Sequence, residues 1–143
     1  TDAPEAAQRF DGYRQGLAEA GLPFDPALVV PAHYTMEEAG RTVADFLAAG
    51  IPFDAIFAFS DVIALAAVSA LNEAGRSVPA DVAVVGFDDI VLARHSAPPL
   101  TTVRQDLAMG ARTMVDLLFE RMSGGPVRSA LTPVDLVTRG SSL

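Results

Sequence analysis

The sequence predicts an α/β fold in which a parallel, Rossmann-like sheet carries helices on both faces. The first observation is an unbroken apolar run at residues 82–86, flanked by turn residues, as in a strand buried in the middle of a parallel sheet. The second is the alternation of strand and helix patterns, with short loops, over about 60 residues. The third is composition, because 143 residues with 50% hydrophobic and 20% charged content fit one modest domain with a sizeable core.

The chain is expected to begin with a helix. Asp2 and Pro4 are typical of a helix start, and apolar residues at helical spacing continue from there until Gly21 ends the helix. A loop rich in proline follows, and residues 27–30 then have the composition of a short strand. Helix and strand signals therefore alternate from the start.

The middle of the chain repeats this alternation. Thr35 and Glu38 match a capping box, which opens a helix that Gly50 closes. Residues 55–59 form an apolar run typical of a strand, and the helix after them ends at Gly75. With the central strand, these elements make βαβ units, whose crossovers should be right-handed.

The pattern loosens after the central strand. Residues 91–99 are expected to be irregular or to form a single short turn, and residues 100–104 to be extended. A helix is then predicted over residues 106–122, followed by short strands at residues 127–131 and 134–138.

Composition excludes several kinds of chemistry. The net charge is −8 and the ten basic residues are scattered singly, so the chain alone should bind DNA poorly. The absence of cysteine removes disulfides, thiol catalysis and thiolate metal sites. All the basic residues are arginine, which excludes a Schiff-base lysine and a P-loop lysine. We therefore expect no enzyme, no cofactor and no bound metal.

Two further absences guide the expected location. No apolar run approaches the ~20 residues of a membrane helix. The first residues lack the basic and apolar segments of a signal peptide. The sequence therefore predicts a cytoplasmic protein without membrane contact.

Polar residues follow three of the expected strands at their carboxyl ends, where ligands bind in open parallel sheets. These residues are His33 and Tyr34, then Ser60 and Asp61, then Asp88 and Asp89. An aromatic face, a hydroxyl and a carboxylate together suit a polyhydroxylated or heterocyclic molecule. Arg9, on the first helix, would add a cationic donor.

Each candidate has a simpler structural explanation. Ser60 and Asp61 would serve only as helix caps, Asp89 only as a turn residue and Tyr34 only as a loop residue. Arg9 would pair with an acid one helical turn away, a contact worth only ~0.3–0.5 kcal/mol. Of these candidates, the sequence pattern favours a ligand role most clearly for Asp88, which closely follows the buried strand.

Six stretches in this order and spacing resemble the lac-repressor/purine-repressor (LacI/PurR) type of transcription regulators, specifically their effector-binding core. They are residues 9–13 (RFDGY), 34–35 with 40 (YT, G), 55–64 (AIFAFSDVIA), 82–90 (VAVVGFDDI), 98–106 (PPLTTVRQD) and 136–141 (LVTRGS). The resemblance implies a core similar to periplasmic sugar-binding proteins, with two α/β lobes and a ligand cleft between them.

The resemblance also assigns ligand contacts. It implies that Arg9 and Asp88 contact the effector, and that Tyr34, Ser60 and Gln105 often do so as well. Asp61 is also expected to contact the ligand, because of its place after the strand expected at residues 55–59. One departure stands at Ser60, where the family commonly has asparagine; a hydroxyl lacks one of the amide's donors, which changes the hydrogen bonding there.

The resemblance places the chain in the second half of such a core. Residues 1–104 and 134–143 would form the C-terminal lobe, and residues 105–133 would return to the first lobe. The DNA-binding helix-turn-helix and most of the first lobe are absent from this sequence.

We therefore expect an effector-binding and dimerisation part of a bacterial regulator. Its ligand would be a sugar or a similar small polar molecule, with a nucleobase as the other class, and operator DNA would be bound only through the missing head. The rival is a periplasmic sugar-binding protein of a transporter, which would share the fold and site but require export.

Overall fold

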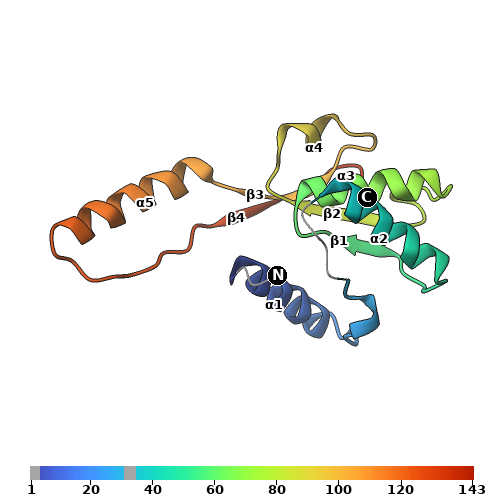
Figure 1. The fold of residues 1–143 in the computed structure, drawn as a ribbon, viewed down its shortest axis with the longest axis horizontal. Coiled ribbons are helices and arrows are strands. Elements are labelled where there is room, and N and C mark those ends of the chain that lie inside the picture. Colours follow the sequence, from blue (N-terminus) through green and yellow to red (C-terminus); the bar gives the residue numbers. More distant parts are fainter. Residues whose placement is uncertain (1–3, 31–34) are drawn as a thin grey trace.

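The computed structural model of the chain describes residues 4–30 and 35–143. Four strands form one sheet, four helices surround it and a fifth extends away from it (Figure 1). The helices are α1 (Pro4–Glu19), α2 (Met36–Ala48), α3 (Asp61–Glu73), α4 (Val91–His95) and α5 (Leu107–Met122), with a 3-10 helix η1 (Pro26–Leu28). The strands are β1 (Ala55–Phe57), β2 (Ala83–Phe87), β3 (Thr101–Gln105) and β4 (Val134–Val137). Among the described residues, no helix is long and apolar enough to cross a membrane.

The sheet has the order β1-β2-β3-β4. Strands β1, β2 and β3 are parallel, as predicted, and Ile56 lies opposite Val84 in the register. Strand β4 is antiparallel to β3, with Leu136 opposite Val103. The sheet is therefore mixed, with its parallel part in the βαβ region of the sequence.

Helix α3 covers one face of the sheet, where the core is tightest. Val84 and Leu71 are fully buried there. Gly86 lies directly beneath α3, and a Cβ at this position would collide with the Asp61 side chain and approach the Ala64 Cβ to 3.2 Å. Only glycine fits at this position, because β2 and α3 approach closely at the carboxyl end of the strand.

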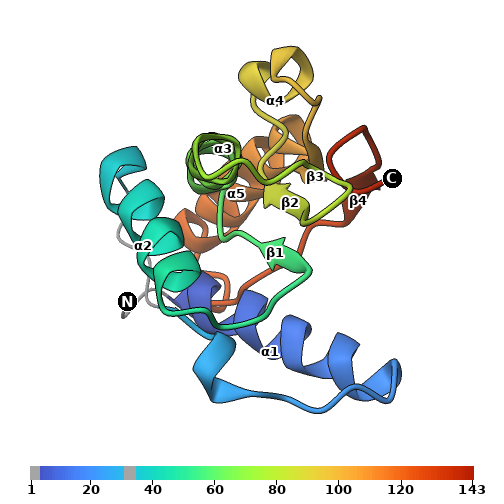
Figure 2. The same ribbon diagram turned by 90° about the vertical axis from the view of Figure 1, so that its right-hand side faces the viewer.

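Helix α1 lies on the opposite face (Figure 2). Successive residues of a strand point to opposite faces, so Phe57 and Phe87 point away from α3. The Phe57 ring stacks on Tyr13 with 6.5 Å between centroids, and the Phe87 ring lies under the guanidinium of Arg9. Helices on both faces were predicted, and the structure confirms them.

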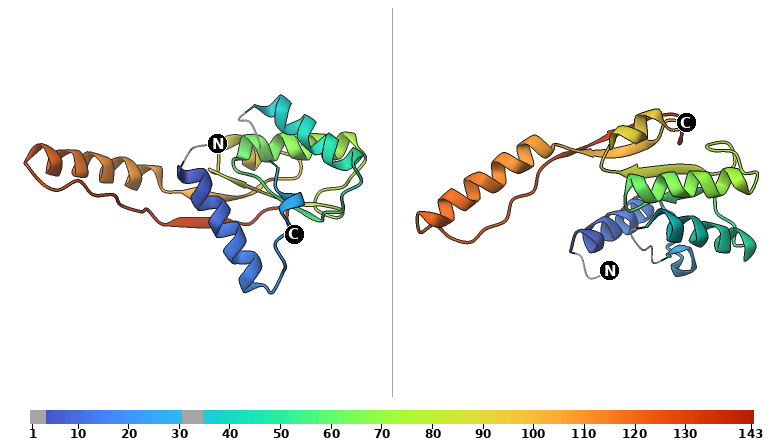
Figure 3. Two further views of the ribbon diagram at one scale, coloured as in Figure 1. Left: turned by 60° about the horizontal axis from the view of Figure 1, so that its bottom comes forward. Right: turned by 45° about the horizontal axis from the view of Figure 1, so that its top comes forward.

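Helix α5 projects from the sheet as an arm, and the chain returns alongside it to β4 (Figures 1 and 3). None of its residues is buried. Leu107, Met114, Leu118 and Met122 have exposed fractions of 57–72%. The apolar stripe of this helix is thus not covered by the sheet that precedes it.

Two predicted strands are wrong. Residues 27–30 begin within η1, because Asp25 caps that turn by accepting from the Ala27 amide at 2.8 Å. Residues 127–131 pair with no strand among the described residues, and Val127 and Leu131 are 82% and 90% exposed. Both segments have apolar β-branched residues, but a strand also needs a neighbouring strand to pair with.

Candidate ligand-binding site

The turn after β2 places the first candidate residues. Asp88 and Asp89 have φ values of 116° and 51°, the only positive values among non-glycine residues of the described chain. Side chains rarely adopt this region, and such conformations persist only where surrounding contacts hold them. The Asp88 amide donates to the Val103 carbonyl at 2.9 Å, which fixes the turn against β3.

Asp88 and Gln105 form a pair across the carboxyl ends of β2 and β3. Gln105 donates its side-chain amide to Asp88 Oδ1 at 2.8 Å, and both residues are half-buried. One carboxylate oxygen and the Gln105 carbonyl oxygen keep further capacity to accept hydrogen bonds. The pair is thus an acceptor group located where parallel sheets bind ligands.

Arg9 reaches the same edge from α1. Its guanidinium lies 4.3 Å from the centroid of the Phe59 ring and 3.8 Å from that of the Phe87 ring. It also donates to the Phe59 carbonyl at 2.8 Å. Stacking on two aromatic faces and this hydrogen bond fix the guanidinium, whose other N–H groups remain as donors.

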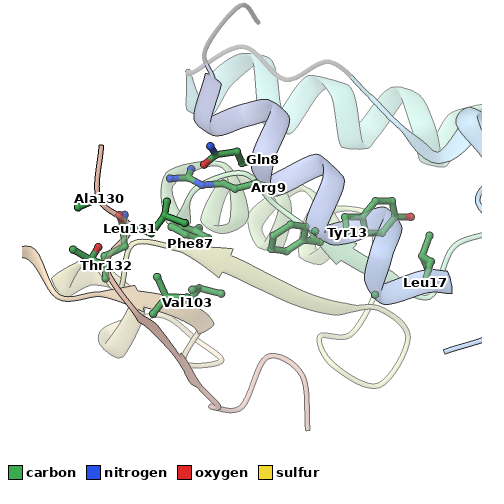
Figure 4. Close-up of a pocket in the computed structure, with 14 residues that line it drawn as sticks. Gln8, Arg9, Tyr13, Leu17, Phe87, Val103, Ala130, Leu131 and Thr132 are labelled. Atoms are coloured by element: carbon green, nitrogen blue, oxygen red, sulfur yellow. The ribbon is translucent and has the colours of Figure 1, made fainter. Parts of the chain in front are cut away.

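A pocket of about 710 Å³ lies between α1, the sheet and the segment before β4 (Figure 4). Its wall is mostly apolar, with Arg9 and Gln105 among its few polar groups. The lining residues are Gln8, Arg9, Gly12, Tyr13, Gly16, Leu17, Phe57, Phe87, Val103, Gln105, Ala130, Leu131, Thr132 and Val134. Asp88 is not among them but is hydrogen-bonded to Gln105, which is. An apolar wall with a few convergent polar groups is typical of small-molecule sites.

Ser60 and Asp61 lie at the start of α3. Ser60 caps the helix by accepting from the Ile63 amide at 3.4 Å. Asp61 has no exposed surface and accepts from the Ile90 amide at 2.8 Å and the Thr102 hydroxyl at 2.5 Å. The predicted ligand contact of Asp61 therefore does not agree with its position, because both carboxylate oxygens bind the protein.

Burial also affects the ionisation of this carboxyl group. Desolvation raises the pKa of Asp61 above its usual value, although the hydrogen bonds from Thr102 and Ile90 lower it in part. The nearby charges of Asp88 and Asp89 raise it further. Asp61 thus links α3, β3 and the turn after β2, although its burial disfavours the charged form of the carboxyl group.

Asp89 has more partners than a turn residue requires. Its side chain is 2% exposed and accepts from Arg139 at 2.5 Å, Arg104 at 2.6 Å and Arg94 at 3.2 Å. Burial alone would raise its pKa, but Arg139 and Arg104 outweigh it and lower the pKa from 3.8 to about 2. Arg104 and Arg139 lie in the stretches that resemble the family and Arg94 lies outside them, and nothing in the sequence indicated that the three converge.

Tyr34 and His33 fall outside the described residues. In the described part of the chain, no three acidic or histidine side chains lie close enough together to hold a metal ion. The structure thus brings together Arg9, Asp88 and Gln105, with Ser60 beside Phe59.

The model of the periplasmic binding protein-like domain family matches residues 1–142. The chain belongs to this family. Within it, the relatives of this periplasmic binding protein-like domain are LacI-type regulators. The regulator CelR of Thermobifida fusca is 39% identical over 133 residues, which cover 91% of this chain and 39% of CelR.

Solved structures agree with this membership. A CelR–cellobiose complex matches with a TM-score of 0.88 and 38% identity, covering 95% of this chain and 42% of that one. The lac repressor dimer bound to operator and an anti-inducer matches with a TM-score of 0.85 and 30% identity, covering 97% of this chain and 48% of the repressor chain. The domain spans less than half the length of these relatives.

Proposed function

We propose that this chain is the effector-binding part of a LacI-type transcription regulator and that its effector is a sugar or a similar polar molecule. The observation that carries the proposal is the Asp88–Gln105 pair, which lies at the carboxyl ends of β2 and β3 beside the pocket that Arg9 lines. The relationship to CelR, which was solved with cellobiose, supports the sugar class.

The pocket has the groups that a sugar requires. Phe57 and Phe87 line the pocket and, beside their contacts with Tyr13 and Arg9, offer apolar surface for the C–H face of a pyranose. Gln105 can accept from a hydroxyl, and Arg9 can donate to a ring or hydroxyl oxygen. A nucleobase would also stack on these rings, and it remains the second ligand class.

Regulation would follow from differential binding. A ligand held between two lobes favours the closure state it binds better, and coupled DNA-binding heads then change their affinity for operator. In this proposal residues 105–133 contribute to the first lobe, and the DNA-binding head lies outside this chain. The net charge of −8 supports DNA binding by another part of the protein.

Three further parts of the proposal concern partners and location. The regulator would act as a homodimer in the cytoplasm, where it meets operator DNA, and would have no catalytic role. The relatives favour this reading over the solute-binding protein of a transporter. Specific retention of operator DNA by the full-length protein would separate the two.

A thermal-shift screen of the full-length protein with cellobiose, other sugars and nucleobases tests the ligand class. A ligand at 100 times its Kd stabilises the folded state by ~2.7 kcal/mol, a shift of several degrees. We expect a sugar to raise the melting temperature of the wild type and not of Arg9→Ala. Stabilisation by a nucleobase alone would contradict the sugar class.

A further inference from the structure

We infer that Asp89 is a positioning residue for the ligand site: clamped by three arginines, it fixes the turn that holds Asp88 against Gln105. The importance of this arrangement for a ligand rests on the proposed function. The geometry itself is independent of the proposed function, since it concerns only contacts within the chain.

The first argument is convergence. The three arginines come from three different elements: Arg94 from α4, Arg104 from β3 and Arg139 from the segment after β4. They reach both oxygens of one buried carboxylate, Arg139 at Oδ1 and the other two at Oδ2. Arg139 also donates to the Leu100 carbonyl at 2.8 Å, so it is fixed at two points. A carboxylate held in this way cannot rotate freely.

The second argument is strain. Both residues of the turn have positive φ, at 116° and 51°. Contacts outside the turn must maintain this conformation, because the backbone does not favour it for aspartate at φ 116°. Two amides of the turn bind β3: the Asp88 amide donates to the Val103 carbonyl at 2.9 Å, and the Asp89 amide donates to the Thr102 hydroxyl at the longer distance of 3.4 Å. The ion pairs of the Asp89 side chain add a constraint at the second residue of the turn, where the backbone contact is the longer of the two.

The third argument is register. Consecutive residues of β3 pair with consecutive residues of the turn: Arg104 with Asp89 at 2.6 Å and Gln105 with Asp88 at 2.8 Å. Because neighbouring residues on a strand point to opposite faces, the ion pair lies on the side away from the pocket and the amide pair on the pocket side. A shift of Asp89 relative to Arg104 would move Asp88 relative to Gln105.

The alternative is that Asp89 only stabilises the fold. The two roles differ in a measurable way, because a purely stabilising residue can be changed without altering the Asp88–Gln105 hydrogen bond in the folded protein. The test therefore observes the Gln105 side-chain amide directly, and the melting temperature separately.

The experiment compares Asp89→Asn with Glu120→Gln in the full-length protein labelled with ¹⁵N-glutamine. Glu120 forms an exposed ion pair with Arg128 at 2.5 Å; neither residue lines the pocket, and Glu120 serves as the matched control. Gln105→Glu assigns the signal. We expect Asp89→Asn to speed hydrogen exchange of the Gln105 amide at least tenfold, and Glu120→Gln to leave it unchanged. A lower melting temperature with an unchanged Gln105 signal would overturn the inference.

A second pair of variants applies if Asp89→Asn does not fold. Arg104→Gln removes the 2.6 Å contact, and Arg94→Gln removes the longer contact of a more exposed side chain. We expect the larger change at Gln105 in Arg104→Gln, and a Gln105 side-chain amide signal and exchange rate equal to those of the wild type in Arg104→Gln would overturn the inference. No added ligand is needed, so a failed sugar screen and a failed positioning test are distinguishable.

Discussion

Thr102 donates its hydroxyl to the Asp61 carboxylate at 2.5 Å, and this contact joins the middle of β3 to the first residue of α3. Both residues are fully buried. The second oxygen of Asp61 accepts from the Ile90 amide, so one carboxylate satisfies donors from two other segments. A buried group with this many contacts is expected to matter for stability more than for ligand binding.

Asp61→Ala should destabilise the fold. The change leaves the Thr102 hydroxyl and the Ile90 amide without their acceptor, at a cost of about 2–4 kcal/mol. Urea unfolding at neutral pH measures this loss in the full-length protein. Asp61→Asn should also destabilise, because one of its two terminal atoms donates and would face a donor. Wild-type stability in both variants would contradict the prediction.

The Asp89 ion pairs predict a specific pH dependence. Their stabilisation is complete above the unfolded pKa of 3.8 and is lost as pH falls through the folded pKa of about 2. It amounts to at most about 2 kcal/mol, since the half-exposed Arg94 and Arg104 are screened by solvent. The difference in unfolding free energy between wild type and Asp89→Asn should therefore shrink below pH 4. A constant difference from pH 6 to 3 would contradict it.

Asp88→Ala should weaken effector binding without unfolding the lobe. The variant removes the acceptor that orients Gln105, and hydrogen bonds to a charged group are worth roughly 1.5–3 kcal/mol, or ~10–150-fold in affinity. Calorimetry with the sugar that stabilises the wild type measures this loss. Asp135→Ala, an exposed acid on β4, is the control and should bind like the wild type.

Arg9→Lys should not rescue Arg9→Ala. The planar guanidinium stacks on Phe59 and Phe87 while it donates to a carbonyl, and a lysine ammonium cannot reproduce both contacts. We expect affinity for the sugar to fall in both variants by calorimetry. Equal affinity of Arg9→Lys and wild type would show that only the charge is needed.

The local pattern was enough to predict most elements. The central strand, expected at residues 82–86, is found at Ala83–Phe87, because a buried apolar run is a property of the segment itself. The capping box was also correct: the Thr35 hydroxyl accepts from the Glu38 amide at 3.3 Å. The strand expected at residues 27–30 was wrong, because pairing depends on a neighbour that no local pattern specifies.

The site was predictable only in part. Arg9, Asp88 and Gln105 were proposed from strand ends and from the family resemblance, and the structure places them at one edge of the sheet. The burial of Asp61 and the three arginines around Asp89 depend on contacts 5 to 50 residues apart in the sequence. Composition and spacing carry no information on such contacts. The sequence therefore could not show that Asp61 is more than a helix cap, or that Asp89 is more than a turn residue.

The exposed stripe of α5 leads to the last prediction. Leu107, Met114, Leu118 and Met122 are 57–72% exposed and lie on one side of the helix at successive spacings of seven, four and four residues. Burying a side chain of this size is worth ~1.5–3 kcal/mol, so an uncovered stripe is a strong drive toward association. We expect the 143-residue chain to self-associate through α5 at tens of micromolar, a concentration range accessible to light scattering.

Substitutions on α5 distinguish association through this stripe from nonspecific association. Met114→Glu with Leu118→Glu should return the chain to a monomer, because two charges interrupt the apolar surface. Arg112→Glu changes the net charge by the same two units outside the stripe and should leave association intact. In the full-length protein, where residues 105–133 are proposed to join the first lobe, the double variant should instead lower the melting temperature. A folded wild-type monomer at these concentrations would show that the exposed stripe does not drive association.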